Sequence, residues 1–146
     1  MKKNNLIKLI TKIFIKHKLK KNHASICAEA LVNAELVGAP THGLSRLKMY
    51  CDRIKKRVIN PKPKIKIKKI SQSITHIDAN NSIGFVAADL GIKIAIQHAQ
   101  KTGIGMVAVK NSGHYGLSGY YAEQAVKKNL ISMIYTNAPP AVAPHG

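Results

Sequence analysis

The fold is decided by the stretch Gly105-Met-Val-Ala-Val-Lys-Asn-Ser-Gly-His-Tyr-Gly-Leu-Ser-Gly119. Its first five residues have the composition of a buried strand, and residues 111–119 form a glycine-rich loop that leads into a predicted helix. In α/β proteins this order brings ligands to the ends of strands and to the exposed N–H groups of helices. The loop glycines recur at every third residue, which matches neither the G-x-G-x-x-G dinucleotide fingerprint nor a P-loop.

The segments on either side of this stretch predict an alternation of strands and helices. A helical pattern covers Gly84–Thr102, and Gly103 follows it as a residue that is free to take a positive φ. Lysines alternate with isoleucines over residues 64–68, as in a half-exposed or edge strand, and Ile74–Asp78 predicts a second short strand. The remaining predicted elements are a turn at residues 79–82 and a further strand at Leu130–Tyr135.

Three helices are predicted before residue 60. The first is amphipathic, with an apolar stripe within residues 6–14 and lysines at every fourth residue on another face. The second covers roughly Ala24–Leu36, and the third begins near Gly43 with an apolar stripe that faces the core. A different face of the third helix carries three polar side chains, Arg46, Tyr50 and Arg53. The whole chain therefore predicts an α/β fold, with a helical N-terminal subdomain over residues 1–60 followed by alternating strands and helices over residues 61–146.

The composition is that of a globular chain with an uneven charge. Its 146 residues, 45% of them apolar, are enough to bury one core, and no apolar run is long enough to span a bilayer. Residues 1–69 carry 19 basic and three acidic side chains, whereas residues 70–146 carry five and three. Only three of the basic residues are arginine, the residue that usually reads bases or clamps phosphates. We favour a compositional background over a specific nucleic-acid site; electrostatic attraction to RNA or to an anionic surface stays open as the alternative.

The cysteines and the N-terminus bear on the cellular compartment. Cys27 and Cys51 are too few and too isolated for a disulfide framework or a zinc site. Lysines interrupt the apolar part of the N-terminus, so no secretory signal is predicted. We expect a cytoplasmic protein with buried, reduced thiols.

The first candidate site is Thr41-His-Gly-Leu-Ser-Arg46. His42 and Arg46 are four residues apart at a predicted helix start, so their side chains are expected to project on one side. A neutral imidazole beside a fixed guanidinium could bind a carboxylate and exchange a proton with a neighbouring hydroxyl. The plainer alternative is that His42 caps the helix and Arg46 lies along its surface.

The second candidate site is Gly113-His-Tyr-Gly116, at the junction of strand and helix. Its glycines permit close approach of the backbone to a ligand, with His114 at the edge of that ligand. The alternative is a tight turn with a histidine that faces solvent. The histidines show no convincing metal-ligand spacing, so no metal site is predicted.

Three segments resemble the malate/L-lactate dehydrogenase family, which also includes ureidoglycolate dehydrogenase and diketogulonate reductase. They are Ala34-Glu-Leu-Val-Gly-Ala-Pro-Thr-His-Gly-Leu-Ser-Arg-Leu47, Ile104-Gly-Met-Val-Ala-Val-Lys-Asn-Ser-Gly-His-Tyr-Gly116 and Thr136-Asn-Ala-Pro-Pro-Ala-Val-Ala-Pro144. The resemblance runs from about residue 5 to the last residue. Its two histidine motifs are specific as a set, because their order and their spacing both match.

The resemblance implies a non-Rossmann fold and hydride transfer between NAD or NADP and a small 2-hydroxy or 2-oxo acid. At matching positions, His114 would be the general acid/base, with His42 beside it as proton-transfer partner or substrate ligand. Which of the two is the principal catalytic group stays open. Arg46 would hold the substrate carboxylate. The cofactor contacts would be Gly116, Thr136, Asn137 and Ala138. A homodimer is also implied.

The chain departs from the family pattern in its length. Members are more than twice as long, and many continue with an aromatic residue and two glycines where this chain stops at Pro144-His-Gly146. We therefore expect a truncated chain. Two further alternatives to an active dehydrogenase stay open: an inactive remnant, and a non-catalytic subunit that folds only with a partner.

Overall fold

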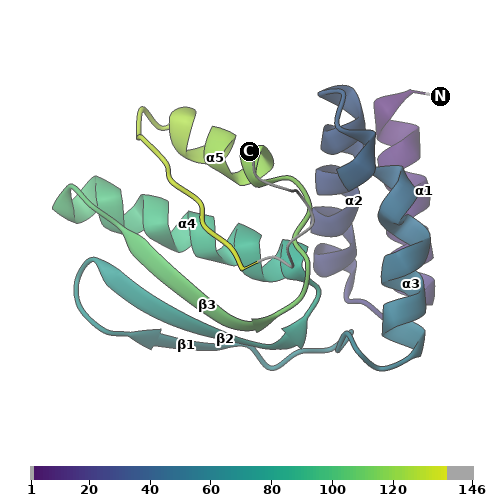
Figure 1. Cartoon of the computed structure of the whole chain (residues 1–146), viewed down its shortest axis with the longest axis horizontal. Coiled ribbons are helices and arrows are strands. Elements are labelled where there is room, and N and C mark those ends of the chain that lie inside the picture. The colour runs from purple at the N-terminus through teal and green to yellow at the C-terminus, as the bar shows by residue number, and fades with distance from the viewer. Residues whose placement is uncertain (1, 138–146) are drawn as a thin grey trace, which may run out of the picture.

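The computed structural model describes residues 2–137 and confirms the predicted α/β fold. Three helices stand together at one end of the molecule, and a three-stranded sheet with two helices forms the other end (Figure 1). The N-terminal helices are α1 (Lys3–Lys16), α2 (Lys21–Leu36) and α3 (Leu47–Lys55). The elements that follow are β1 (Lys66–Lys69), β2 (Ile74–Ser82), α4 (Gly84–Thr102), β3 (Met106–Ser112) and α5 (Ser118–Val126).

The first two helices form as their patterns predict. Ile10 and Phe14 of α1 are buried, whereas the lysines of that helix are exposed. The apolar stripe of α1 packs on α2, and burial of such a stripe is what stabilises most helices in proteins. The buried side chains of α2 are mostly alanines, which let α1, α4 and α5 approach it closely. Helix α2 therefore joins the two ends of the molecule through one core.

The third helix begins later than predicted. Two 3₁₀ turns, Pro40–His42 and Leu44–Arg46, precede α3 and are separated by Gly43, whose non-helical backbone (φ −99°, ψ −137°) interrupts the helix. The carboxylate of Glu35 on α2 accepts the N–H of Leu44 at 2.6 Å and anchors this segment. The predicted start of this helix near Gly43 is therefore wrong, and His42 and Arg46 lie in two separate 3₁₀ turns.

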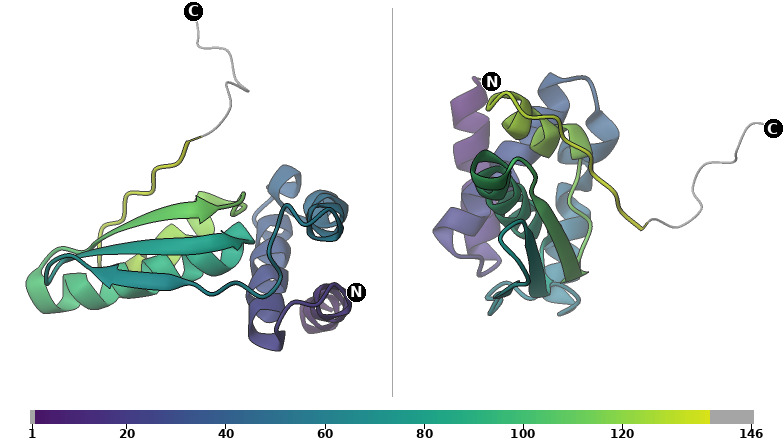
Figure 2. Two further views of the ribbon diagram at one scale, coloured as in Figure 1. Left: turned by 90° about the horizontal axis from the view of Figure 1, so that it is seen from below. Right: turned by 90° about the vertical axis from the view of Figure 1, so that its left-hand side faces the viewer.

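The sheet has the order β1-β2-β3, with β1 antiparallel and β3 parallel to β2. Helix α4 connects the parallel strands and covers one face of the sheet, whereas the other face is open among residues 2–137 (Figure 2). Accordingly Thr75, Ile77 and Ala79 of β2 are buried and His76 is exposed. The turn predicted at residues 79–82 is wrong, because β2 continues to Ser82. Two asparagines with positive φ, at positions 80 and 81, make the strand irregular there, a conformation that asparagine tolerates better than most residues.

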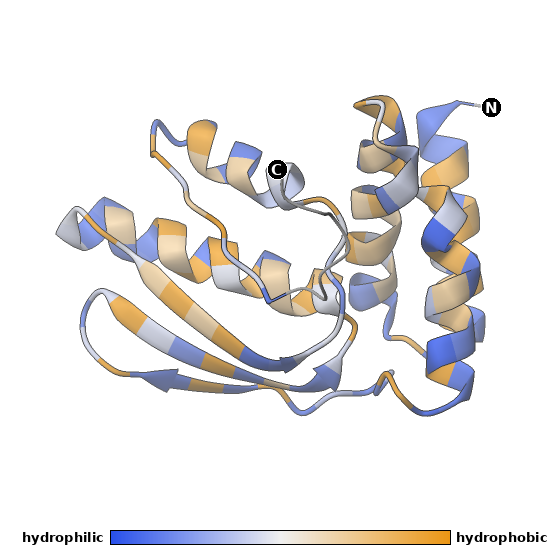
Figure 3. Ribbon diagram, viewed as in Figure 1, coloured by the Kyte–Doolittle hydropathy of each residue, from blue (hydrophilic) through white to orange (hydrophobic). Residues whose placement is uncertain are grey.

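The predicted strands near the C-terminal side fit less well. β3 forms, but it is an edge strand whose residues are mostly exposed, so its expected full burial is wrong. The strand predicted at Leu130–Tyr135 is also wrong, since residues 130–137 have no regular secondary structure. Both β3 and residues 130–137 contain apolar residues, shown in orange in Figure 3, and Ile131 is 95% exposed. An apolar alternation forms a strand only where another strand pairs with it, and no such partner lies within residues 2–137.

Two further features concern the helices and the thiols. None of the helices within residues 2–137 combines the length and the apolar character needed to cross a membrane. Cys27 and Cys51 are both buried free thiols, as predicted. Burial raises the pKa of the Cys27 thiol well above its usual value, which keeps this side chain protonated and unreactive.

Candidate active site

The two histidine motifs, far apart in the sequence, meet where the helical end joins the sheet. His114 lies on the loop between β3 and α5, and His42 lies in the 3₁₀ turn that precedes α3. Their rings stack with centroids 5.8 Å apart and planes inclined by 21°. The structure therefore brings together two of the predicted site residues that are 72 positions apart.

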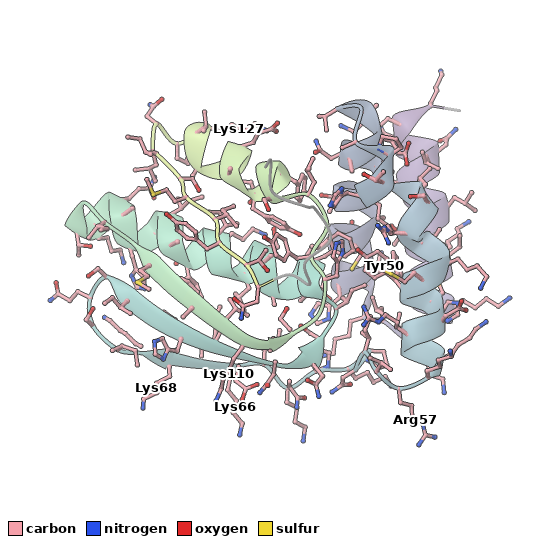
Figure 4. The ribbon with its side chains drawn as sticks, in the orientation of Figure 1. Tyr50, Arg57, Lys66, Lys68, Lys110 and Lys127 are labelled. Atoms are coloured by element: carbon pink, nitrogen blue, oxygen red, sulfur yellow. The ribbon has the colours of Figure 1, made fainter. Side chains whose placement is uncertain are left out.

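A tyrosine that the sequence analysis did not single out completes this cluster. The Oη atom of Tyr50 lies 2.6 Å from Nδ1 of His114, and the Tyr50 side chain is fully buried. Its ring packs edge-on against Phe85, with centroids 5.0 Å apart. Tyr50 comes from α3 and projects toward the sheet end of the molecule, as Figure 4 shows. The sequence feature that could have identified Tyr50 as a site residue is its position four residues after Arg46, on the helix face that we predicted to lie away from the core.

Close approach of backbones holds the His114 loop in place. A Cβ atom at Gly84, the first residue of α4, would collide with the carbonyl oxygens of Gly113 and His114. Gly116 has a φ of +79°, and a Cβ atom there would come within 2.5 Å of the Phe85 ring. Its N–H donates to Nδ1 of His114 at 3.3 Å. Glycines at both positions are therefore required for the observed position of the imidazole.

The Arg46 side chain lies beside this cluster and is only partly engaged. Its Nε–H donates to the carbonyl oxygen of Thr41 at 2.8 Å, and the Thr41 hydroxyl lies 3.1 Å from Nδ1 of His42. A guanidinium has five N–H donors, so four remain for a ligand. Because Arg46 is exposed, these donors are accessible to a carboxylate.

Burial and neighbouring cations set the protonation of the site. The pKa of His114 is lowered, first by burial and then by the nearby charges of His42, Arg46 and Arg53. The imidazole of His114 is therefore predominantly neutral at pH 7. Burial also raises the pKa of Tyr50 far above its usual value, so its hydroxyl keeps its proton. That hydroxyl can donate to Nδ1 or accept from it, and both neutral tautomers of His114 have a partner.

The residues expected to contact a cofactor are only partly brought to this site. Gly116 belongs to it through its bond to His114. Thr136 and Asn137 are exposed, and the Thr136 hydroxyl donates to the Asn137 carbonyl at 3.3 Å. Ala138 lies outside the described residues. Within residues 2–137 no group of three or more His, Cys, Asp or Glu side chains is placed to hold a metal ion.

Fold and site together define an α/β protein with a histidine–tyrosine pair beside an accessible arginine, a set of side chains that can move protons and bind a carboxylate. A family model described as malate/L-lactate dehydrogenase matches residues 1–146. The chain belongs to this family, as its resemblance predicts.

Three similar relatives carry the names of dehydrogenases. The malate dehydrogenase of Pyrococcus abyssi is 40% identical over 144 residues, which make up 99% of this chain and 40% of that protein. The L-sulfolactate dehydrogenase of Methanocaldococcus jannaschii is 38% identical over 100% of this chain and 42% of its own. The ureidoglycolate dehydrogenase (NAD(+)) of Escherichia coli O157:H7 is 34% identical over 88% of this chain and 37% of its own.

Solved structures agree with these matches. The sulfolactate dehydrogenase from Methanocaldococcus jannaschii superposes with a TM-score of 0.85 at 36% identity, over 88% of this chain and 38% of that one. The malate dehydrogenase from Pyrococcus horikoshii OT3 gives a TM-score of 0.83 at 38% identity, over 86% and 36%. This chain therefore has the fold of the corresponding part of these enzymes, and it spans about two fifths of the length of the curated relatives it matches.

Proposed function

We propose that the chain carries the proton-transfer and carboxylate-binding part of an NAD- or NADP-dependent 2-hydroxy-acid dehydrogenase. The observation that carries this proposal is the Tyr50–His114 pair next to His42 and Arg46. The names of the relatives indicate the substrate class: malate, sulfolactate and ureidoglycolate are small hydroxy acids. Malate and sulfolactate each carry a second acid group.

In the proposed reaction His114 acts as the general base. In the tautomer with its proton on Nδ1, the imidazole donates to the Tyr50 hydroxyl and gives up the 3.3 Å hydrogen bond from the Gly116 N–H. Its Nε2 is then free to take the proton of the substrate 2-hydroxyl. The electron pair of the O–H bond would form the carbonyl as the hydride leaves C2, and a bound nicotinamide would supply the two-electron acceptor for that hydride. His42 lies beside the imidazole as a proton-transfer partner or substrate ligand.

The remaining site residues bind the substrate and the cofactor in this proposal. Arg46 holds the substrate carboxylate with the donors that Thr41 leaves free. Gly116, Thr136, Asn137 and Ala138 contact the cofactor. The exposed hydroxyl and amide of Thr136 and Asn137 fit the polar groups of a nicotinamide nucleotide, which offer matching donors and acceptors.

The organisation of the active unit is part of the same proposal. Residues 1–60 would form the substrate and dimerisation subdomain, and residues 61–146 would supply part of the cofactor-binding domain of a cytoplasmic homodimer. Apolar side chains are exposed on β3 and on residues 131–135. They support the association of this chain with another chain, because monomers rarely expose large apolar patches. Light scattering during gel filtration measures the oligomeric state directly, and a monodisperse monomer would contradict the homodimer.

We propose no specific nucleic-acid partner. The lysines are spread over both ends of the molecule. Lys66, Lys68 and Lys110 project from the same side of the sheet in Figure 4, where Asp78 lies 3.9 Å from Lys110, whereas Lys127 lies apart from them at the end of α5. The apolar stripe of α1 packs on α2 and is not available to a membrane surface. Leu9 and Ile15 are the exposed large apolar side chains of that helix. Tight RNA binding that weakens steeply with salt would overturn this view.

Titration with NADH and NADPH, followed by turnover of a panel of 2-oxo and 2-hydroxy acids, tests the proposal. Replacing His114 or His42 by alanine is expected to lower turnover about 10²–10⁴-fold, the usual contribution of a proton-transfer group. His76→Ala, an exposed histidine on the open sheet face, is the matched control and leaves turnover unchanged. A well-folded chain that binds neither nucleotide would contradict the proposal and favour an inactive remnant.

The pH profile gives a second test. Oxidation needs the neutral imidazole, so the rate rises with pH as His114 loses its proton. Because burial and the neighbouring His42, Arg46 and Arg53 side chains lower the pKa of His114, the midpoint lies below the ordinary value of 6.5. A midpoint at or above 6.5 would contradict the assignment of His114 as the base.

A further inference from the structure

A cavity lies beside the His114 loop and has no role in the reaction described above. It is where the carboxyl ends of β2 and β3 meet the end of α3, and its volume is about 220 Å³. That volume is well above the ~10–15 Å³ that one water molecule needs. Its lining includes Arg53, Val58, Asn81, Ser82, Ser112 and Gly113, and Gly113 directly precedes His114.

Ser82 is the first sign that this cavity receives a ligand. Its side chain is 1% exposed, and its Oγ atom has no hydrogen-bond partner among residues 2–137. The other buried polar side chains there are satisfied: Thr75 bonds His98, and Asp89 bonds Lys93. A buried hydroxyl without a partner is unusual in a folded protein, and Ser82 lies in the wall of this cavity.

Arg53 is the second sign. Its guanidinium has no carboxylate within 4.0 Å in the described part of the chain, and no acidic side chain lines the cavity. The neighbouring Asp52 is already bonded to Lys48. The cavity therefore combines an uncompensated positive charge with an unused hydroxyl donor, which is the chemistry that recognises an oxyanion.

The cavity is also close to the reaction centre. Arg53 lies on α3, and Arg46 immediately precedes that helix. Both charges contribute to the lowered pKa of His114 and both act on Tyr50. An anion held by Arg53 would therefore belong to a ligand that also reaches His114.

We propose that the Arg53–Ser82 cavity binds an oxyanion group, a carboxylate, sulfonate or phosphate, of the ligand on which His114 acts. This inference rests on the proposed function for the identity of that ligand. Two sources have the required chemistry: the second acid group of a two-acid substrate, and a phosphate of the cofactor. In either case Arg46 keeps the carboxylate next to the 2-hydroxyl, and Arg53 adds selectivity for a ligand with more negative charge.

Methanesulfonate is a probe that needs neither the reaction nor the cofactor. Added to the full chain, it is expected to shift the backbone amide signals of Ser82 and Gly113 in a saturable way. Arg53→Gln should weaken this binding about tenfold, as loss of a charge-assisted hydrogen bond does. Ser82→Ala should weaken it about threefold, a smaller loss because the bond it removes has a neutral donor.

Arg57→Gln is the matched control, because it removes the same charge just beyond α3. Arg57 does not line the cavity and projects away from it at the lower end of α3 in Figure 4. Binding that does not saturate, or that Arg57→Gln weakens as much as Arg53→Gln, would overturn the proposal. Thermal unfolding of each variant shows that the compared chains are folded.

Ligands of different charge then distinguish the two sources. If Arg53→Gln weakens L-malate but not L-lactate, the oxyanion is the second acid group of the substrate; if it weakens only NADP⁺, the oxyanion is a phosphate. An Arg53→Gln variant that binds all three ligands like the unaltered chain overturns the proposal. Methanesulfonate binding without any binding of hydroxy acids or nucleotides would sustain the anion site and refute the proposed function instead.

Discussion

The contact between Tyr50 and His114 gives the sharpest test of the site. Replacing Tyr50 by phenylalanine removes one oxygen atom and keeps the ring, so its packing against Phe85 is retained. The variant loses the 2.6 Å contact between Oη and Nδ1 of His114. Nδ1 then keeps only the 3.3 Å hydrogen bond from the Gly116 N–H, which permits only the tautomer with its proton on Nε2.

The expected magnitude follows from the bonds that change. One neutral hydrogen bond contributes about 0.5–1.5 kcal/mol to stability, and no cavity is created. For a chain of this size, a loss of about 1 kcal/mol lowers the melting temperature by roughly 2–4 °C. The effect on catalysis is expected to be larger than the effect on stability. The reason is that the tautomer with its proton on Nδ1, which the proposed base needs, loses its hydrogen-bond partner, the Tyr50 hydroxyl. Oxidation should therefore slow by more than the small loss of stability explains.

Tyr121→Phe provides the control for these measurements. Tyr121 is also buried, and its hydroxyl donates to the carbonyl oxygen of Tyr115 at 2.7 Å. Both variants should lower the free energy of urea unfolding by similar amounts. Only Tyr50→Phe should change the ¹⁵N chemical shifts of the His114 ring, which report the tautomer. Unchanged His114 shifts in Tyr50→Phe, or equal changes in both variants, would refute the reasoning.

The other predictions concern the charges around the site and the segment that carries His42. Arg46→Gln should raise the pKa of His114 toward 6.5, because a nearby cation disfavours the imidazolium. Arg57→Gln should leave that pKa unchanged. NMR titration of the imidazole measures the pKa in both variants, and a lower pKa in Arg46→Gln would contradict this prediction. Glu35→Ala should cost about 1–2 kcal/mol of unfolding free energy in urea, because the N–H of Leu44 loses a carboxylate acceptor, and Glu35→Gln should cost less because it keeps an oxygen. Equal stability of Glu35→Ala and the unaltered chain would mean that this bond does not anchor the segment.

The elements that the sequence predicts well are those with a strong local pattern. The bounds of α4 are Gly84–Thr102, as predicted, and Gly103 follows with a φ of +82°. The amphipathic α1 and the alanine-rich α2 also form where expected. In each case the helical period and the residues at the helix end are local signals, which can be recognised within a short stretch of sequence. These helices can therefore be predicted without knowledge of the tertiary fold.

The failures share a cause that lies outside the local pattern. Tyr50 is on the predicted polar face of α3 and yet is buried, because α4 and the His114 loop cover that face. The 79–82 segment has turn residues, but pairing with β3 extends the strand to Ser82. β3 has the sequence of a buried strand and lies exposed at the sheet edge. Neighbours distant in sequence decided each of these outcomes.

The candidate site depends on the same long-range packing. The motifs around His42 and His114 could each be found in the sequence, whereas the hydrogen-bond partner of the His114 ring is Tyr50, which lies 64 positions away and in neither motif. Gly84 shows why the pairing is specific: α4 begins so close to the His114 loop that no Cβ atom fits between them. Phe85, the next residue, then contacts both Tyr50 and Gly116. The start of one helix therefore positions the imidazole without contributing a reactive group, and the chemistry of the site is inseparable from the core that connects the helical end to the sheet.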